Sequence, residues 1–80
     1  MTRAEPFKKA QKAYESFIQK YPKSEWVPQA EFGIASCLEE EDLLELAYQK
    51  YETLKARYPS QRVIGVKLAR IKERLALRKR

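Results

Sequence analysis

The chain has 80 residues, a formal net charge of +6, one cysteine and no histidine. This length suits one small domain, whose core alone contributes only a few kcal/mol of net stability. A single cysteine excludes an intrachain disulfide. The lack of histidine excludes the usual zinc sites and every histidine-based acid–base or nucleophile arrangement. We therefore expect no enzymatic activity, no metal and no cofactor.

Apolar residues recur at intervals of three and four, the spacing of one face of an α-helix. Pro6 fits a first helical turn, and the Tyr-Pro pairs at 21–22 and 58–59 are expected to end helices. Ser24 and Ser60 suit the capping position before the next helix. The pattern predicts helices over Ala4–Lys20, from Glu25 or Pro28 to Glu40, over Leu43–Arg57, and over Arg62–Leu77.

The chain also repeats itself with an offset of 37 residues. The matched pairs in the first and third predicted helices are Phe7/Leu44, Ala10/Ala47, Tyr14/Tyr51, Phe17/Leu54, Tyr21/Tyr58 and Pro22/Pro59. In the second and fourth they are Val27/Ile64, Ile34/Ile71 and Leu38/Leu75. A period of this size is typical of stacked helical repeats. The predicted fold is all-α, with four antiparallel helices stacked as two αα-hairpins, and the first stripe, Phe7 to Tyr21, is expected to be buried.

The middle of the chain resembles a tetratricopeptide repeat (TPR). Ala35 is similar to the small residue of that family's first helix, flanked by Ile34 and Leu38, and the second helix shows Ala47, Tyr51, Leu54 and Pro59 at the family's positions. In this register one domain spans 1–80, with a complete repeat over 28–61 between half-units at 4–22 and 62–79. Two residues depart from the family's pattern. Asp42 stands where the family has a turn glycine, and aspartate adopts the left-handed conformation of such a turn more readily than most residues. Glu31 stands where the family has a large aromatic residue.

The resemblance implies a non-catalytic protein–protein interaction module or scaffold. The family's groove residues correspond by position to Gln29, Phe32, Ser36, Glu39 and Glu40. Phe32 lies off the apolar stripe, so it either contacts a partner or packs against the fourth helix. The implied partner is another protein or peptide, a neighbouring copy or further repeats. A structural subunit, a fragment of a longer array and an engineered minimal repeat remain alternatives.

The compartment is expected to follow from the length of the natural protein. No apolar stretch approaches the roughly 20 residues that span a bilayer, and the first residues carry no signal-peptide core. The chain as given is thus expected to be soluble and cytoplasmic. Its Tyr-Pro-x-Ser connector resembles repeats of bacterial cell-envelope proteins, so a piece excised from a longer chain would be periplasmic or belong to the cell envelope.

Positive charge is concentrated at the C-terminus, where residues 67–80 hold the whole surplus. Lys67, Arg70, Arg74 and Arg78 recur at helical spacing and are expected on the face opposite the apolar stripe of the fourth helix. This basic patch could bind nucleic acid or an anionic surface. No aromatic residue is interleaved for base stacking, so a solvated face explains the patch equally well. The acidic residues 39–42 could instead attract the basic tail of a neighbouring copy.

Two further expectations concern apolar residues. Cys37 is expected to be a buried, unreactive thiol. Ile18, Leu43, Leu46 and Tyr48 lie off the main stripes, where they either pack internally or form a partner surface. The charged fourth helix is expected to close the stack, which leaves the outer side of the first helix as the open docking surface.

Overall fold

The computed structural model describes residues 5–78, and helices make up most of this part of the chain. The helices are α1 (Glu5–Lys20), α2 (Val27–Glu40), α3 (Leu44–Leu54) and α4 (Gln61–Arg78). Residues 5–78 contain no strand, so the predicted all-α class is confirmed. Ala4, the expected start of the first helix, lies outside the described residues.

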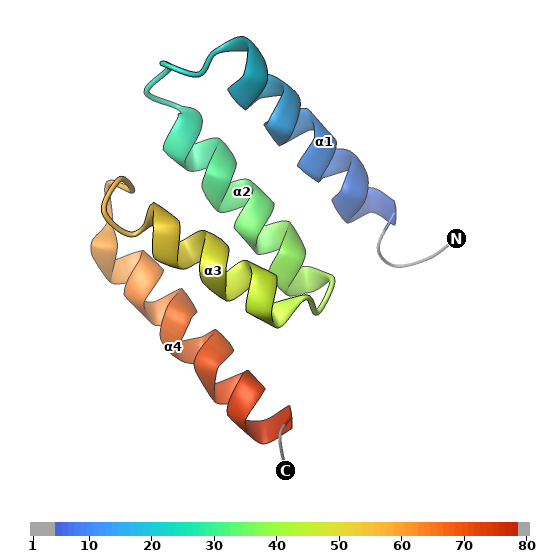
Figure 1. Ribbon diagram of the computed structural model, residues 1–80, viewed down its shortest axis with the longest axis vertical. Coiled ribbons are helices and arrows are strands. Elements are labelled where there is room, and N and C mark those ends of the chain that lie inside the picture. The colour runs from blue at the N-terminus through green and yellow to red at the C-terminus, as the bar shows by residue number, and fades with distance from the viewer. Residues whose placement is uncertain (1–4, 79–80) are drawn as a thin grey trace.

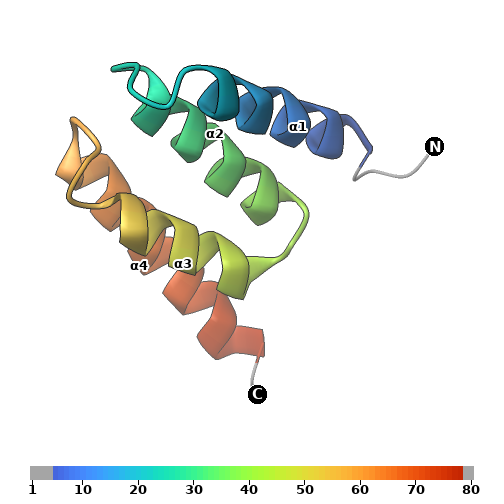
Figure 2. The same cartoon turned by 45° about the horizontal axis from the view of Figure 1, so that its top comes forward.

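Each helix runs antiparallel to the next and packs against it, so that the order in space follows the order in the sequence (Figure 1). The Cα atoms extend over 42 × 35 × 14 Å, which makes a thin array. The second view brings α3 in front of α4 while α1 and α2 stay together on the other side (Figure 2). Thus α2 and α3 have a helical neighbour on both sides, and α1 and α4 have one on a single side.

A serine lies in the turn before α2 and another in the turn before α4, and the two serines make different hydrogen bonds. The Ser60 hydroxyl accepts a hydrogen bond from the Val63 N–H at 3.4 Å, so Ser60 caps α4 as predicted. Ser24 instead accepts from the Trp26 N–H at 3.1 Å, and α2 begins only at Val27. Ser24 therefore shapes the connecting turn and is not the N-cap of α2.

The third helix is shorter than predicted. It ends at Leu54 instead of Arg57, and residues 55–57 form turns. The N–H groups of Arg57 and Tyr58 both donate to the Leu54 carbonyl, at 2.9 and 3.0 Å. The chain tightens here because Tyr58 precedes a proline and is pushed out of the helical region.

The turn between α2 and α3 contains Asp42 in the left-handed conformation, with φ of 67°. The Leu43 N–H donates to the Leu38 carbonyl at 2.9 Å, and the Asp42 N–H donates to the Glu39 carbonyl at 3.0 Å. These two bonds form a Schellman motif, which usually has glycine at the left-handed residue. The expectation that Asp42 substitutes for that glycine is confirmed.

The buried core lies between α2, α3 and α4, and none of the α1 residues whose burial is described belongs to it. Its buried members are Ala35, Leu44, Ala47, Tyr51, Leu54, Ile64, Leu68 and Ile71. The prediction that the first stripe is buried is wrong for Tyr14 and Tyr21, whose exposed fractions are 38% and 57%. Phe7, Ala10 and Phe17 are half-buried. The reason is that α1 contacts α2 on one side and no described element on the other.

Candidate partner-binding site

The first two helices approach each other closely at Gly33. A Cβ atom at this residue would lie 2.5 Å from the ring of Tyr14, which is shorter than any real contact. The glycine therefore lets the Tyr14 ring lie directly on the backbone of α2. Gly33 thus marks a point of close approach between α1 and α2.

A hollow of about 310 Å³ opens beside this contact, at the junction of α1 and α2. Its lining consists of Phe7 and Tyr14 from α1, and of Phe32, Gly33, Ser36, Cys37 and Glu40 from α2. Three of the five predicted groove residues, Phe32, Ser36 and Glu40, are therefore brought together. The other lining residues are mainly aromatic or small, which suits an apolar side chain of a partner.

Phe32 also has a structural role. Its ring stacks on Tyr58, with centroids 4.9 Å apart, and contacts the edge of Tyr51 at 5.5 Å. It thus packs against Tyr51 of α3 and Tyr58 of the turn that follows, at the edge of the core shared by α2, α3 and α4. Truncation of Phe32 would disturb the core as well as the hollow.

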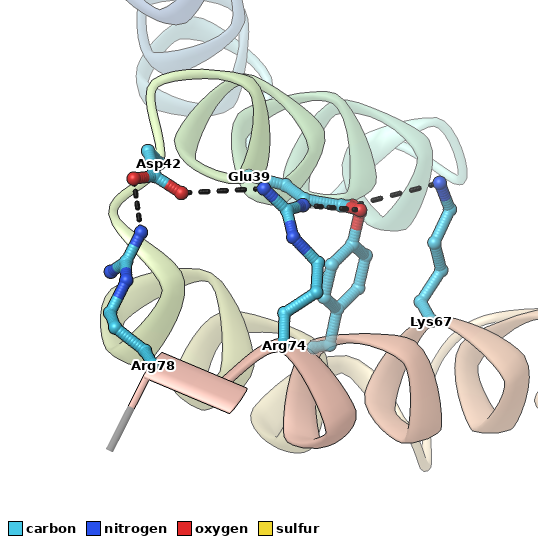
Figure 3. Close-up of polar contacts among 6 residues, drawn as sticks. Glu39, Asp42, Lys67, Arg74 and Arg78 are labelled. Carbon is cyan, nitrogen blue, oxygen red and sulfur yellow. Dashed lines mark hydrogen bonds and ion pairs between the residues drawn. The ribbon is translucent and has the colours of Figure 1, made fainter. Parts of the chain in front are cut away.

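Glu39 lies apart from the hollow, on the side of α2 that faces α3 and α4. Its side chain is buried, with an exposed fraction of 6%. Its carboxylate accepts a hydrogen bond from the Tyr51 hydroxyl at 3.2 Å and lies 3.6 Å from Lys67 Nζ and 3.8 Å from an Arg74 nitrogen (Figure 3). Two cations and a hydroxyl thus compensate a buried carboxylate.

The neighbouring turn extends this contact to the end of α4. Asp42 pairs with Arg74 at 3.3 Å through one oxygen and with Arg78 through the other (Figure 3). We call Glu39, Asp42, Tyr51, Lys67, Arg74 and Arg78 the polar cluster. It attaches α4 to the C-terminal end of α2, two helices that are not adjacent in sequence.

The polar cluster changes the interpretation of the basic patch. Lys67, Arg74 and Arg78 lie on the flank of α4 beside α2, so the prediction that they form a ridge opposite the apolar stripe is wrong for these three. Their charges meet acidic residues of the same chain. Arg70, the fourth member, is exposed and makes no ion pair within residues 5–78.

The Tyr51 hydroxyl and the Cys37 thiol in this region both have a raised pKa, which favours their neutral forms. Burial, the negative charge of Glu39 and the hydrogen bond to it raise the pKa of Tyr51 well above its usual range. Burial and the nearby Glu41 and Glu40 raise the pKa of the Cys37 thiol. A thiol that resists ionisation is a poor nucleophile, as expected for this buried cysteine.

Sequence reasoning missed one pair at the outer edge of the α2–α3 interface. Arg57 donates two parallel hydrogen bonds to the Glu31 carboxylate, at 2.7 and 2.8 Å. Such bidentate pairs are directional as well as attractive. The signal was available, because Glu31 is the residue that departs from the family's aromatic preference. Gln29, also predicted in the groove, is exposed and lies outside the hollow.

A second, larger hollow of about 440 Å³ lies on another side of α2. It is lined by Glu15 of α1, by Ile34 and Leu38 of α2, and by Leu46, Gln49, Lys50 and Thr53 of α3. Leu46 is one of the apolar residues that lie off the main stripes, and it has an exposed fraction of 52%. Beside its apolar side chains, the wall of this hollow carries one carboxylate, one ammonium group, one amide and one hydroxyl.

Three observations bear on what the chain resembles and what it could bind. Within residues 5–78, no helix is long and apolar enough to cross a membrane. No group of three or more potential metal ligands converges among these residues. No protein-family model matches the chain, and neither does any curated protein or any solved structure.

Proposed function

We propose that the chain is a non-catalytic protein–protein interaction module of TPR type, and that a partner binds at the hollow between α1 and α2. One observation carries this proposal. Tyr14 and Tyr51 occupy the same position of the repeat, yet Tyr51 is fully covered and Tyr14 has an exposed fraction of 38%. An aromatic residue of a packing stripe that faces solvent beside a hollow indicates a surface that another element covers.

The alternative function, binding of nucleic acid or an anionic surface through α4, has less support. Three of its four predicted residues are engaged in the polar cluster. A hollow of about 220 Å³ on α4 is lined by Arg62, Val63, Val66, Lys67 and Arg70, so it shares Lys67 with the polar cluster. Apolar valines among the cations do not provide the stacking surface that single strands need.

A site-specific photo-cross-linker tests the proposal. The cross-linking residue is placed at Glu40, on the rim of the hollow, and in a matched variant at Lys72, which is exposed on α4. We expect cross-links to a partner protein that form from position 40 and not from position 72. They should disappear when Ser36→Trp fills the hollow, while circular dichroism shows an unchanged fold. Identical adducts at both positions, or adducts that Ser36→Trp leaves intact, would contradict the proposed site.

A further inference from the structure

The repeat shows what a neighbour of α1 looks like, because the equivalent place in the second half of the chain is filled. Shifting the hollow's Tyr14 and Cys37 by 37 residues gives Tyr51 and Arg74. The Glu39 carboxylate of α2 lies between these two, 3.2 Å from the Tyr51 hydroxyl and 3.8 Å from Arg74. The hollow beside Tyr14 is therefore the repeat-related counterpart of a place that a helix, α2, occupies.

The α2–α3 interface shows which side chains that helix carries. Glu31 pairs with Arg57, and the adjacent Phe32 packs its ring against Tyr51 and Tyr58. The counterparts of the three receiving residues on the α1 side are Lys20, Tyr14 and Tyr21, at the same offset of 37. All three are exposed. A helix packed on α1 in the same way would thus bring a carboxylate to Lys20 and an aromatic ring to the two tyrosines.

The two places differ in the chemistry of their floor. Lys67 and Arg74, which hold Glu39, correspond to Ala30 and Cys37 in the first unit. Arg70 corresponds to Gly33, and the lining of the hollow contains no cation. Glu40 even places a negative charge at its rim. The side chain that enters the hollow, seven residues after the aromatic one, should therefore be large and apolar where α2 has a glutamate.

We propose that the open flank of α1 binds an amphipathic helix of a partner protein. Its pattern is an acidic residue, an aromatic residue directly after it, and a large apolar residue seven positions beyond the aromatic one. Charge favours such a partner, because α1 carries four lysines against two glutamates. This inference rests on the proposed function and adds to it the chemistry of the partner.

A second copy of the chain does not offer this pattern on a free helix. The α4 helix is the repeat counterpart of α2, but Leu68, Ala69 and Ala76 stand where α2 has Glu31, Phe32 and Glu39. Leu68 is moreover buried in its own core. The matching face of α2 itself is covered by α3. A different protein is therefore the occupant that the surface fits.

The probe for the test is a synthetic peptide of residues 26–42 with Glu39→Leu, and with Cys37→Ser to prevent oxidation. It is titrated into the full chain, with affinity from calorimetry and location from backbone amide shifts. We expect shifts centred on Tyr14, Phe17 and Tyr21. The same peptide with Glu39 retained should bind about tenfold more weakly, because its carboxylate would be buried unpaired. A Phe32→Ala peptide should lose about tenfold as well.

A charge exchange tests the register. Lys20→Glu in the full chain should weaken binding about threefold, the size expected for an exposed pair, and Glu31→Lys in the peptide should restore it. Lys72→Glu makes the same change of net charge on α4 and should leave the affinity unchanged. Restoration by the reversed pair supports the packing mode, since a general charge effect would not be rescued.

Several outcomes would overturn the inference. Shifts centred on Tyr51 would mean that the peptide displaces the chain's own α2. Tighter binding of the Glu39 peptide would contradict the apolar hollow. A concentration-dependent mass of the free chain, with the same shifts on α1, would assign the flank to a second copy. Failure of the peptide together with adducts specific to position 40 would overturn the partner chemistry alone, whereas failure of both would overturn the proposed function too.

Discussion

The stripe of α1 and the stripe of α3 are nearly the same sequence in two different surroundings. Tyr14 and Tyr51 share one position of the repeat, with exposed fractions of 38% and 0%. The third helix is covered by α2 on one side and α4 on the other, whereas α1 packs mainly against α2. The comparison teaches that an apolar stripe indicates which face of a helix can be buried. The number of neighbouring helices decides how much of that face is buried.

The two second helices of the repeat differ in a complementary way. In α2 the positions facing the first helix hold small, uncharged residues such as Gly33 and Cys37, and a hollow remains beside them. In α4 the corresponding positions hold Arg70 and Arg74, and Arg74 reaches the acidic end of α2. One copy thus keeps an open apolar place, and the other completes an internal polar contact.

The largest effect should come from truncating the two tyrosines. Tyr51→Ala removes a fully buried ring and should cost about 3–5 kcal/mol, which is enough to unfold a domain of this size. Tyr14→Ala removes a partly exposed ring and should cost roughly 1–2 kcal/mol. Urea denaturation followed by circular dichroism measures both. Equal losses would mean that the stripe of α1 is as well covered as that of α3.

The two glycines should respond to alanine with opposite signs. In Gly33→Ala the new methyl group must displace the Tyr14 ring, and overpacking of this kind costs roughly 1–3 kcal/mol. In Gly65→Ala no atom lies within 4 Å of the new methyl group, so helix propensity should add up to about 1 kcal/mol. Thermal melts of the two variants provide the comparison. A Gly33→Ala variant as stable as Gly65→Ala would contradict the close contact between α1 and α2.

A pH series isolates the environment of Tyr51. Folding raises the pKa of the Tyr51 hydroxyl. The contribution of this neutral hydroxyl to the free energy of unfolding is therefore fully present below about pH 10 and is lost as pH rises beyond that value. The free energy of unfolding should then fall by up to about 1.4 kcal/mol per pH unit. Tyr51→Phe should reduce this slope, leaving the contributions of Cys37 and Tyr48, whose pKa values are also raised. An unchanged slope in Tyr51→Phe would contradict the burial of the hydroxyl beside Glu39.

The smallest effect is expected at the end of α4. Asp42→Asn keeps a residue that tolerates the left-handed conformation but removes the pairs with Arg74 and Arg78, at a cost of about 0.5–1 kcal/mol. This loss should shrink at 1 M salt, where exposed charges are screened. Asp42→Gly loses the same pairs and regains about 1 kcal/mol of backbone strain, so its stability should stay near that of the natural chain. A loss independent of salt would argue against the ion pairs.

Much of the local structure could be predicted from the spacing of the apolar residues and from the residues that end helices. The interval of three and four apolar residues and the two Tyr-Pro pairs predicted the helices, and Asp42 was recognised as the left-handed residue of the turn. The end of α3 could not be predicted as well, because residues 55–57 suit a helix by composition, whereas the structure has turns there ahead of Pro59. The same limit applies to Ser24, whose hydroxyl could cap either the turn or the helix.

The candidate site was predictable only in part. Phe32, Ser36 and Glu40 do line one hollow, since helical spacing already places them on one side of α2. Glu39 follows the same spacing loosely, yet its charge is drawn to Tyr51 and to the cations of α4. The contribution of Phe7 and Tyr14 needed the tertiary structure, because a sequence cannot say which half of a stripe a neighbour covers.

By itself, the sequence determined that the chain is helical, where most helices begin and end, and that its two halves are copies offset by 37 residues. These properties are local, or follow from a period. Only the tertiary structure decided that the basic residues of α4 meet Glu39 and Asp42, and that the stripe of α1 stays half open. Both depend on which helices become neighbours, because burial and ion pairing arise between elements that are distant in the chain.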